Sequence, residues 1–314
     1  MNAKRTGTEK HIPVLLQPVL DGLRIDPGGT YIDGTFGRGG HSRAILGQLG
    51  ATGRLLAIDR DLEAAAEVDA ALEADPRFEL IRGEIAELDS IAVERNLEGR
   101  VDGLLLDLGV SSPQLDEARR GFSFQADGPL DMRMDQSQGR TAAEWLATVD
   151  QKELRRVLRE YGEEPRAARI AAAVIAARKD GPIETTGELA AIVSSAAPRH
   201  GQKRHPATRT FQAIRIAVND ELDQLDAALR ASPALLRKGG RLCVISFHSL
   251  EDRRVKRFMR DASREPAMYR GLPDVPDEVK PSFRIVGRAI TASAEEIEAN
   301  PRSRSARLRV AERT

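Results

Sequence analysis

The fold of this chain is decided by the stretch Tyr31-Ile-Asp-Gly-Thr-Phe-Gly-Arg-Gly-Gly-His-Ser42. Its apolar beginning predicts a strand that ends on Asp33, and the residues from Ser42 onward predict a helix. The glycines between them let backbone N–H groups approach a nucleotide-like ligand closely. An ordinary strand-to-helix turn has the same spacing, so the glycines alone leave both interpretations open.

Asp33 favours one class of cofactor for this turn. A carboxylate beside the turn would repel the pyrophosphate of a dinucleotide. S-adenosylmethionine instead carries a sulfonium and an ammonium group, and it has no phosphate. We therefore interpret the glycine turn as a methyl-donor loop.

Length and composition set bounds on the protein class. The 314 residues suggest about two domains, or one domain enlarged by an insertion. The 48 Lys and Arg balance the 48 Asp and Glu, so total charge gives no sign of a nucleic-acid partner. The single cysteine, Cys243, excludes an intramolecular disulfide framework and fits a reducing compartment. The polar start and the absence of an apolar run near the ~20 residues of a membrane span predict a soluble, cytoplasmic protein without a membrane partner.

Strands and helices alternate along most of the chain. Apolar runs predict parallel strands at 28–32, 54–59, 78–82, 101–107 and 241–247. Helices are predicted at 42–50, 62–74, 85–96 and 250–262, and two late strands at 283–289 and 305–311 form an antiparallel pair. The pattern is that of an α/β protein with a doubly wound sheet.

The alternation stops once, from about 111 to 205. This part holds a loop rich in glycine and charge and then helices near 151–160, 165–179 and 186–196. Residues 210–230 follow as one amphipathic helical segment with the apolar stripe Phe211, Ile214, Val218, Leu222, Leu225 and Leu229. We predict a sheet domain of residues 1–112 and 208–314, with residues 113–207 as an inserted helical domain.

Two further acids end predicted strands. Asp59 ends the second strand, where a carboxylate can accept hydrogen bonds from both hydroxyls of an adenosine ribose. Asp107 ends the fourth strand. Because the carboxyl ends of parallel strands share one edge, Asp33, Asp59 and Asp107 are expected together there, where open α/β sheets bind ligands. A solvated acid opening a turn is the alternative interpretation of Asp59.

Six blocks of the sequence resemble the bacterial 16S ribosomal RNA cytosine-N4 methyltransferases, the small subunit methyltransferase H family. The blocks are Asp33–Ser42, Leu106–Asp116, Arg120–Asp135, His205–Ile216, Val244–Arg253 and Asn300–Arg307. The resemblance implies a class I S-adenosylmethionine-dependent methyltransferase with a Rossmann-like sheet, an antiparallel last strand and an inserted helical domain. It also implies methylation of N4 of one cytidine in the decoding region of 16S rRNA within the 30S subunit.

The resemblance also implies which residues bind S-adenosylmethionine. The cofactor-binding positions of the family correspond here to Gly39, Gly40, His41, Asp59, Asp107 and Gln114. They add to Asp33, which was inferred above. A further contact, usually aromatic in the family, falls on Ile85. An aliphatic side chain there can pack on adenine but cannot stack on it.

Methyl transfer to a cytosine amino group is favoured by hydrogen-bond acceptors next to that group. The lone pair of a cytosine amino nitrogen is delocalised into the ring, and acceptors on its N–H groups localise that pair. Asp107 and His248, at the ends of the fourth and fifth strands, are our candidates. The chain lacks the Pro-Pro-aromatic motif of many amino-methyltransferases, so Phe122, Phe124 and Phe247 are the candidates for stacking on the base.

Local charge favours an RNA partner. Residues 189–219 contain no acid, and the predicted RNA contacts are Arg199, Lys203, Arg204 and Arg209 there, with Arg302 and Arg304 near the end. Five cations also crowd the predicted helix 250–262. Charge runs are often solvated faces, which leaves a protein or small-molecule methyltransferase, or a non-enzymatic RNA-binding module, as alternatives. The histidines show no paired metal spacing, so no metal is predicted.

Overall fold

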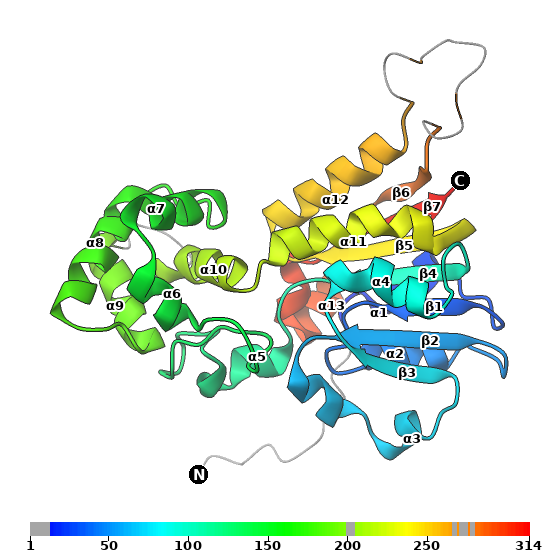
Figure 1. The fold of residues 1–314 in the computed structure, drawn as a ribbon, viewed down its shortest axis with the longest axis horizontal. Coiled ribbons are helices and arrows are strands. Elements are labelled where there is room, and N and C mark those ends of the chain that lie inside the picture. The colour runs from blue at the N-terminus through cyan, green and yellow to red at the C-terminus, as the bar shows by residue number, and fades with distance from the viewer. Residues whose placement is uncertain (1–12, 199–204, 266–268, 270–275, 277–279) are drawn as a thin grey trace. The chain divides into compact units, whose positions relative to one another are not determined.

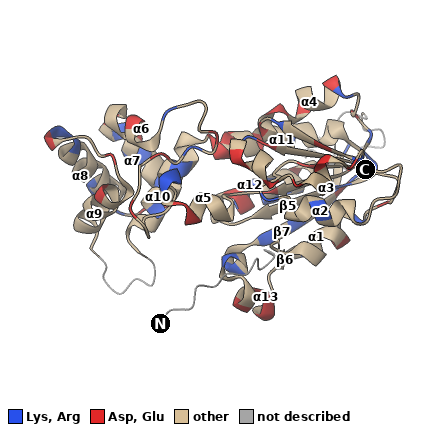
Figure 2. Ribbon diagram, turned by 90° about the horizontal axis from the view of Figure 1, so that it is seen from below, with Lys and Arg blue, Asp and Glu red and all other residues tan. Residues whose placement is uncertain are grey.

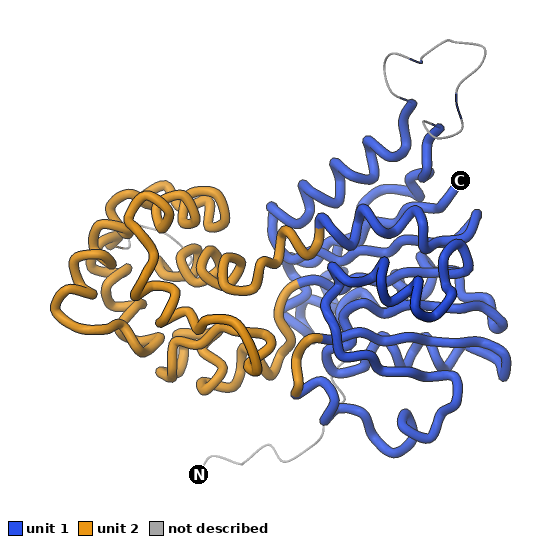
Figure 3. Tube along the Cα trace, viewed as in Figure 1, with its two compact units in different colours: residues 1–59, 63–108, 226–314 blue, residues 60–62, 109–225 orange. Residues whose placement is uncertain are grey.

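The computed structural model describes residues 13–198, 205–265, 269, 276 and 280–314. The chain divides into two compact units (Figure 3). Unit 1 comprises Met1–Asp59, Glu63–Leu108 and Asp226–Thr314, and unit 2 comprises Arg60–Leu62 and Gly109–Leu225. Unit 2 thus contains the predicted insertion 113–207 and continues beyond it at both ends.

Unit 1 is built on a seven-stranded sheet in the order β3-β2-β1-β4-β5-β7-β6 (Figure 1). The first five strands in this order are parallel, whereas β7 runs antiparallel to both β5 and β6. The strands are β1 (Thr30–Asp33), β2 (Arg54–Asp59), β3 (Phe78–Arg82), β4 (Val101–Asp107), β5 (Leu236–Ser246), β6 (Phe283–Thr291) and β7 (Arg307–Arg313). The doubly wound sheet with an antiparallel last strand, as in class I methyltransferases, is therefore confirmed.

Helices cover both faces of this sheet (Figure 1). On one face, α1 (Leu16–Leu23) and α2 (Gly40–Leu46) pack against alternate strand residues, including Tyr31, Leu105 and Cys243. Cys243 is fully buried, and burial raises the pKa of its thiol to about 12. The other face carries α4 (Leu88–Glu94), α11 (Glu221–Leu235) and α12 (Ser249–Ala262). The remaining short elements are η1 (Leu62–Glu67), α3 (Ala70–Glu73), η2 (Ile85–Glu87), α13 (Ala294–Ala299) and η6 (Pro301–Ser305).

The single helix predicted at 62–74 is wrong. The chain forms the 3₁₀ helix η1 and then the one-turn helix α3. Asp69 causes the break, because its backbone is extended (φ −81°, ψ 168°) and its side chain accepts hydrogen bonds from the N–H groups of Ala71 and Leu72. A capping aspartate begins a new helix and cannot continue the previous one.

The single amphipathic segment predicted at 210–230 is also wrong, because α10 (Ala207–Val218) ends before α11 begins. Asp220 between them has a left-handed backbone, with φ 49°. The Asn219 side chain donates to the carbonyl of Met132 (2.7 Å) and accepts from the N–H of Met134 (2.8 Å). These long-range bonds hold the break in place, although Phe211, Ile214, Leu222, Leu225 and Leu229 are all buried as predicted.

Unit 2 is helical around its own apolar core. Thr141, Asp150 and Thr185 cap three of its helices, each side chain accepting a backbone N–H of the first turn. The single tryptophan, Trp145, packs against this core. Its elements before α10 are α5 (Ser112–Asp116), η3 (Ala118–Arg120), α6 (Ala142–Thr148), α7 (Gln151–Glu160), α8 (Ala167–Asp180) and α9 (Thr186–Ala196). Within the described ranges, no helix of either unit is long and apolar enough to cross a membrane.

Candidate functional site: the carboxyl edge of the sheet

The glycine turn after β1 has the backbone that the sequence requires. Gly37 and Gly39 have φ values of 54° and 68°, in the left-handed region that glycine adopts without strain. The Gly37 N–H donates to Asp59 Oδ2 at 2.7 Å, so the acid that ends β2 also holds the turn. A Cβ on Gly40 would lie 2.5 Å from Pro13 Cγ. The turn therefore needs its glycines for conformation and for space.

Asp33 braces the same turn from inside unit 1. It is 1% exposed, and its carboxylate accepts hydrogen bonds from the Ser42 hydroxyl (2.7 Å) and the Thr35 N–H (3.1 Å). Burial raises the pKa of Asp33, and these two hydrogen bonds partly oppose the shift. Both carboxylate oxygens thus serve the turn's own structure, and the cofactor contact predicted for Asp33 stays a prediction.

Asp107 and His41 form a pair at the end of β4. Asp107 Oδ2 lies 3.4 Å from His41 Nδ1, and His41 Nε2 lies 3.1 Å from the carbonyl of Val14. Asp107 Oδ1 is buried and makes no hydrogen bond within the described chain, whereas 24% of the side chain is exposed. The solvent-accessible part of the carboxyl group is therefore on the Oδ2 side.

The surroundings of Asp107 disfavour its charged form. Burial is the main cause that holds the pKa of Asp107 well above its ordinary range, and the carboxylates of Asp33 and Glu251 add to it. A perturbed carboxyl group at a sheet edge is typical of a functional site. A cationic or N–H-bearing ligand would relieve this unfavourable environment.

Ile85 joins the same edge as the first residue of η2. A Cβ built on Gly34 would lie 3.3 Å from Ile85 Cγ2, so Ile85 stands next to the start of the glycine turn. Asp33, Gly39, Gly40, His41, Asp59, Ile85 and Asp107 all belong to unit 1, at the carboxyl ends of β1 to β4 or directly after them. Close backbone approach, two acids at strand ends and an apolar neighbour fit an adenosyl group with a positively charged tail.

Replacing Gly39 by Ala is expected to weaken cofactor binding by about tenfold or more. The new Cβ would lie 2.7 Å from the Phe36 ring, and the left-handed backbone costs an L-residue about 1–2 kcal/mol. Titration calorimetry with S-adenosylmethionine measures the affinity. Gly99→Ala is the matched control, because Gly99 has φ 65° but no atom within 4 Å of the added Cβ. Equal affinities of the two variants would contradict a role of the turn in binding.

His248, a candidate catalytic residue, caps α12 in this structure. Its Nδ1 accepts the Glu251 N–H at 3.4 Å, and its Nε2 lies 3.1 Å from Glu251 Oε1. Glu251 in turn accepts the N–H groups of Phe247 (2.7 Å) and His248 (3.2 Å). The arrangement shapes the turn between β5 and α12, and a catalytic role of His248 stays a prediction.

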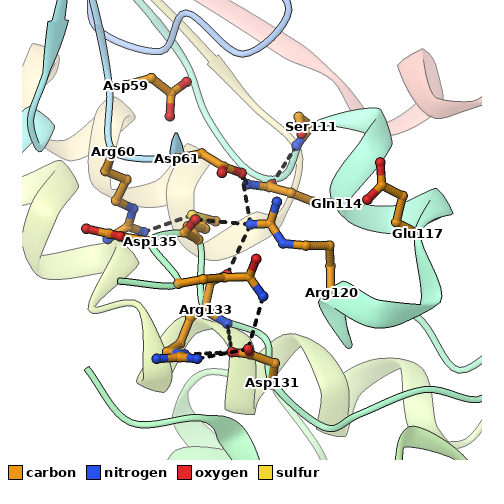
Figure 4. A network of polar contacts seen from close by, with 12 residues as sticks. Asp59, Arg60, Asp61, Ser111, Gln114, Glu117, Arg120, Asp131, Arg133 and Asp135 are labelled. Atoms are coloured by element: carbon orange, nitrogen blue, oxygen red, sulfur yellow. Dashed lines mark hydrogen bonds and ion pairs between the residues drawn. The ribbon is translucent and has the colours of Figure 1, made fainter. Parts of the chain in front are cut away.

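Gln114 lies in a polar network inside unit 2 (Figure 4). Its carbonyl oxygen accepts the Ser111 N–H at 2.9 Å and so caps α5. Its amide nitrogen donates to Asp61 Oδ2 at 2.7 Å. The amide group thus joins α5 to the segment that directly follows β2, and the predicted cofactor contact of Gln114 stays a prediction.

Arg120 is the central residue of this network, and sequence reasoning missed it. Its side chain is fully buried, and Nη2 donates to Asp61 Oδ2 (2.9 Å) and to the carbonyls of Met134 (3.0 Å) and Arg133 (3.2 Å). Figure 4 shows the side chains of Asp61, Gln114 and Arg120 turned toward one another. The sequence signal was weak: an arginine beside a glycine, at the start of one of the six blocks.

The candidate stacking residues have packing partners. Phe122 is buried beneath the Arg120 guanidinium, 5.9 Å from the ring centroid. Phe124 packs edge-on against Phe211, with centroids 4.8 Å apart. Phe247 packs against the core of unit 1. The two loop phenylalanines thus contribute to the interior of unit 2, and a stacking role of the three rings stays a prediction.

The predicted RNA contacts fall into three groups. Arg209 on α10, and Arg302 and Arg304 on η6, are exposed. Arg199, Lys203 and Arg204 lie outside the described residues. Figure 2 shows Lys and Arg positions interspersed with Asp and Glu positions along the ribbon. Exposure makes phosphate contact sterically open for these three arginines, but it does not by itself identify RNA.

Comparison with known proteins gives a consistent picture. The family model described as the MraW methylase family matches residues 8–314. A curated protein from Hydrogenovibrio crunogenus, named ribosomal RNA small subunit methyltransferase H, is 54% identical over 310 residues, which cover 99% of this chain and 98% of that protein.

Solved structures resemble the chain more distantly. One is TrmN from Thermus thermophilus, with a TM-score of 0.43 and 13% identity over 96% of this chain and 48% of that chain. Another is an rRNA methylase from Streptococcus thermophilus, with a TM-score of 0.38 and 13% identity over 96% of this chain and 98% of that chain.

Proposed function

Because this chain belongs to the MraW methylase family, we propose that it methylates the N4 amino group of one cytidine in the decoding region of 16S rRNA. The methyl donor of the family is S-adenosylmethionine. The identity of 54% over nearly the full length of a ribosomal RNA small subunit methyltransferase H carries the proposal. The name of that relative and the resemblance of the six sequence blocks support this choice of substrate, for which the 30S subunit is the corresponding partner.

The residues of unit 1 at the carboxyl edge have separate roles in this proposal. Asp59 accepts hydrogen bonds from the ribose hydroxyls, since its carboxylate already lies at the glycine turn. Gly39 and Gly40 leave room for the cofactor, and Ile85 packs on its adenine. His41 fixes the orientation of the Asp107 carboxyl group, 3.4 Å from its Nδ1.

Asp107 handles the target base in this proposal. When bound, S-adenosylmethionine would supply a methyl group that the amino nitrogen displaces in line from the sulfonium, and the sulfur would leave as a neutral thioether. Asp107 Oδ2 accepts a hydrogen bond from the cytosine amino group and so localises the nitrogen lone pair. It also stabilises the positive charge that develops on this amino group as the N–C bond forms. One amino proton then leaves through Asp107. Because the pKa of Asp107 is raised, the ionised form that can take up this proton increases as pH rises through that pKa.

The test is methyl transfer from labelled S-adenosylmethionine to unmodified 30S subunits. We expect label in one nucleotide of 16S rRNA, identified as N4-methylated cytidine by mass spectrometry of nuclease fragments. Label in ribosomal proteins instead would favour the protein-methylating alternative. Normal cofactor binding without any labelling of 30S subunits would overturn the proposal.

A further inference from the structure

The outward face of α12 carries an uninterrupted row of cations. Arg253, Lys256, Arg257 and Arg260 are exposed. Their spacing of three, four and seven residues places them on one side of the helix. Arg264, two residues past the end of α12 and also exposed, continues the same spacing.

The acids near α12 leave most of this charge uncompensated. Asp252 binds Arg309 (2.7 Å) and Arg307 (3.2 Å) of β7, and Glu251 is turned toward His248. Asp261 is paired with Arg260 at 2.7 Å. Within the described chain, the side chains of Lys256, Arg257 and Arg264 form no hydrogen bond or ion pair. The row is therefore a locally positive surface on a protein with zero net charge.

The opposite face of α12 is fully used by the fold. Leu250, Val255 and Met259 are buried, and the Phe258 ring packs edge-on against Phe283 with centroids 5.8 Å apart. A basic helix that binds membranes inserts its apolar face into the bilayer. Since α12 has no apolar face left for this, a polyanion in water suits the row better than a lipid surface.

The row also starts next to the carboxyl edge of the sheet, where Asp107 lies. Ser246 ends β5 there, Ile245 is paired in register with Asp107, and His248 caps the start of α12. From Arg253 to Arg260 the row extends about 10 Å along the helix. Cations spaced along a line suit the phosphates of a strand that enters or leaves at this edge.

We propose that the row Arg253, Lys256, Arg257, Arg260 and Arg264 binds the sugar–phosphate backbone of the RNA strand that flanks the target nucleotide. This inference rests on the proposed function for the choice of RNA as the polyanion. The row lies outside the predicted RNA contacts and has no part in the methyl-transfer chemistry. It positions the strand and contributes affinity that does not depend on sequence.

The test is the triple variant Lys256→Gln/Arg257→Gln/Arg264→Gln in the full-length protein. Binding to naked 16S rRNA is measured by filter retention across a range of salt concentrations. We expect affinity near 150 mM salt to fall roughly 10- to 100-fold, and the slope of log affinity against log salt to become shallower by about 2. With 30S subunits, KM should rise while kcat at saturating substrate stays unchanged.

A matched control comes from α7, where Lys152, Arg155 and Arg159 are likewise exposed. The variant Lys152→Gln/Arg155→Gln/Arg159→Gln removes the same charge and should bind naked 16S rRNA like the wild type. Equal losses in both triple variants, or no loss in the α12 variant, would overturn the inference. The inference would also be overturned if the α12 variant bound 30S subunits more weakly but naked rRNA normally, because the row would then contact a ribosomal protein.

These results are separable from the proposed function. A wild-type protein that binds rRNA through α12 but leaves 30S cytidines unmethylated refutes the proposed reaction and keeps the RNA-binding row. A wild type that methylates, with an α12 variant of normal KM, salt slope and affinity, refutes the row alone.

Discussion

Replacing Asp107 by Ala is expected to lower kcat for methylation of 30S subunits about 10²- to 10³-fold at saturating cofactor. The substitution removes the only acceptor that our proposal assigns to the cytosine amino group, 3.4 Å from His41. Asp107→Asn should lose less activity, because it keeps an acceptor oxygen of the same shape without the charge. Single-turnover labelling of 30S subunits measures the step directly.

The pH dependence separates a chemical role of Asp107 from a structural one. The pKa of Asp107 is raised, so the protonated form, which carries no negative charge and cannot take up the amino proton, persists to higher pH than for an ordinary aspartate. The wild-type rate should therefore rise as pH increases through the raised pKa, and the Asn variant should lose this rise. An Ala variant that keeps a third or more of the wild-type rate, or an Asn variant with the wild-type pH profile, would contradict the assignment.

Replacing Arg120 by Met is expected to destabilise unit 2 by about 3–5 kcal/mol. Arg120 is fully buried and donates to Asp61 and to two backbone carbonyls, all of which lose this donor at once. Gln114 remains as a donor to Asp61, but a neutral amide compensates a buried carboxylate only in part. Urea unfolding followed by circular dichroism measures the free energy of unfolding.

The neighbouring arginine gives the control for this prediction. The side chain of Arg119 is 61% exposed and is paired with Glu117, so Arg119→Met should cost about 1 kcal/mol or less. The double variant Arg120→Met/Asp61→Leu should recover much of the lost stability, because replacing both charges leaves neither one buried alone. A cost below about 1 kcal/mol for Arg120→Met would show that the network is not what holds these segments together.

The parts of the fold that were predicted correctly have local signals. The bounds of β2, β3 and β4 agree with the predicted 54–59, 78–82 and 101–107, because continuous apolar runs mark buried parallel strands. The helices α7 and α9 begin where Asp150 and Thr185 cap them. The wrong predictions depend on single residues, namely the cap at Asp69 and the long-range bonds of Asn219, which hydrophobic periodicity does not show.

For the candidate site, the sequence predicted where the acids lie but not what each of them does. Acids that end parallel strands were expected at one edge, and Asp33, Asp59 and Asp107 end β1, β2 and β4 of unit 1. The division of their roles was not predictable: Asp33 is committed to the turn, whereas Asp107 keeps an exposed side. The pair of Arg120 and Asp61 joins segments far apart in the sequence, so no local pattern marks it.

The sequence contains one cysteine and one tryptophan, and each lies in a different compact unit, where it can report the unfolding of that unit. Cys243, the single thiol, is sealed within β5 of unit 1, with its pKa raised to about 12. An alkylating reagent can therefore modify it only after the sheet opens. Trp145, the single indole, lies on α6 of unit 2, so its fluorescence follows the other unit. Thiol trapping and fluorescence on the unmutated protein can thus tell whether the two units unfold together or in turn.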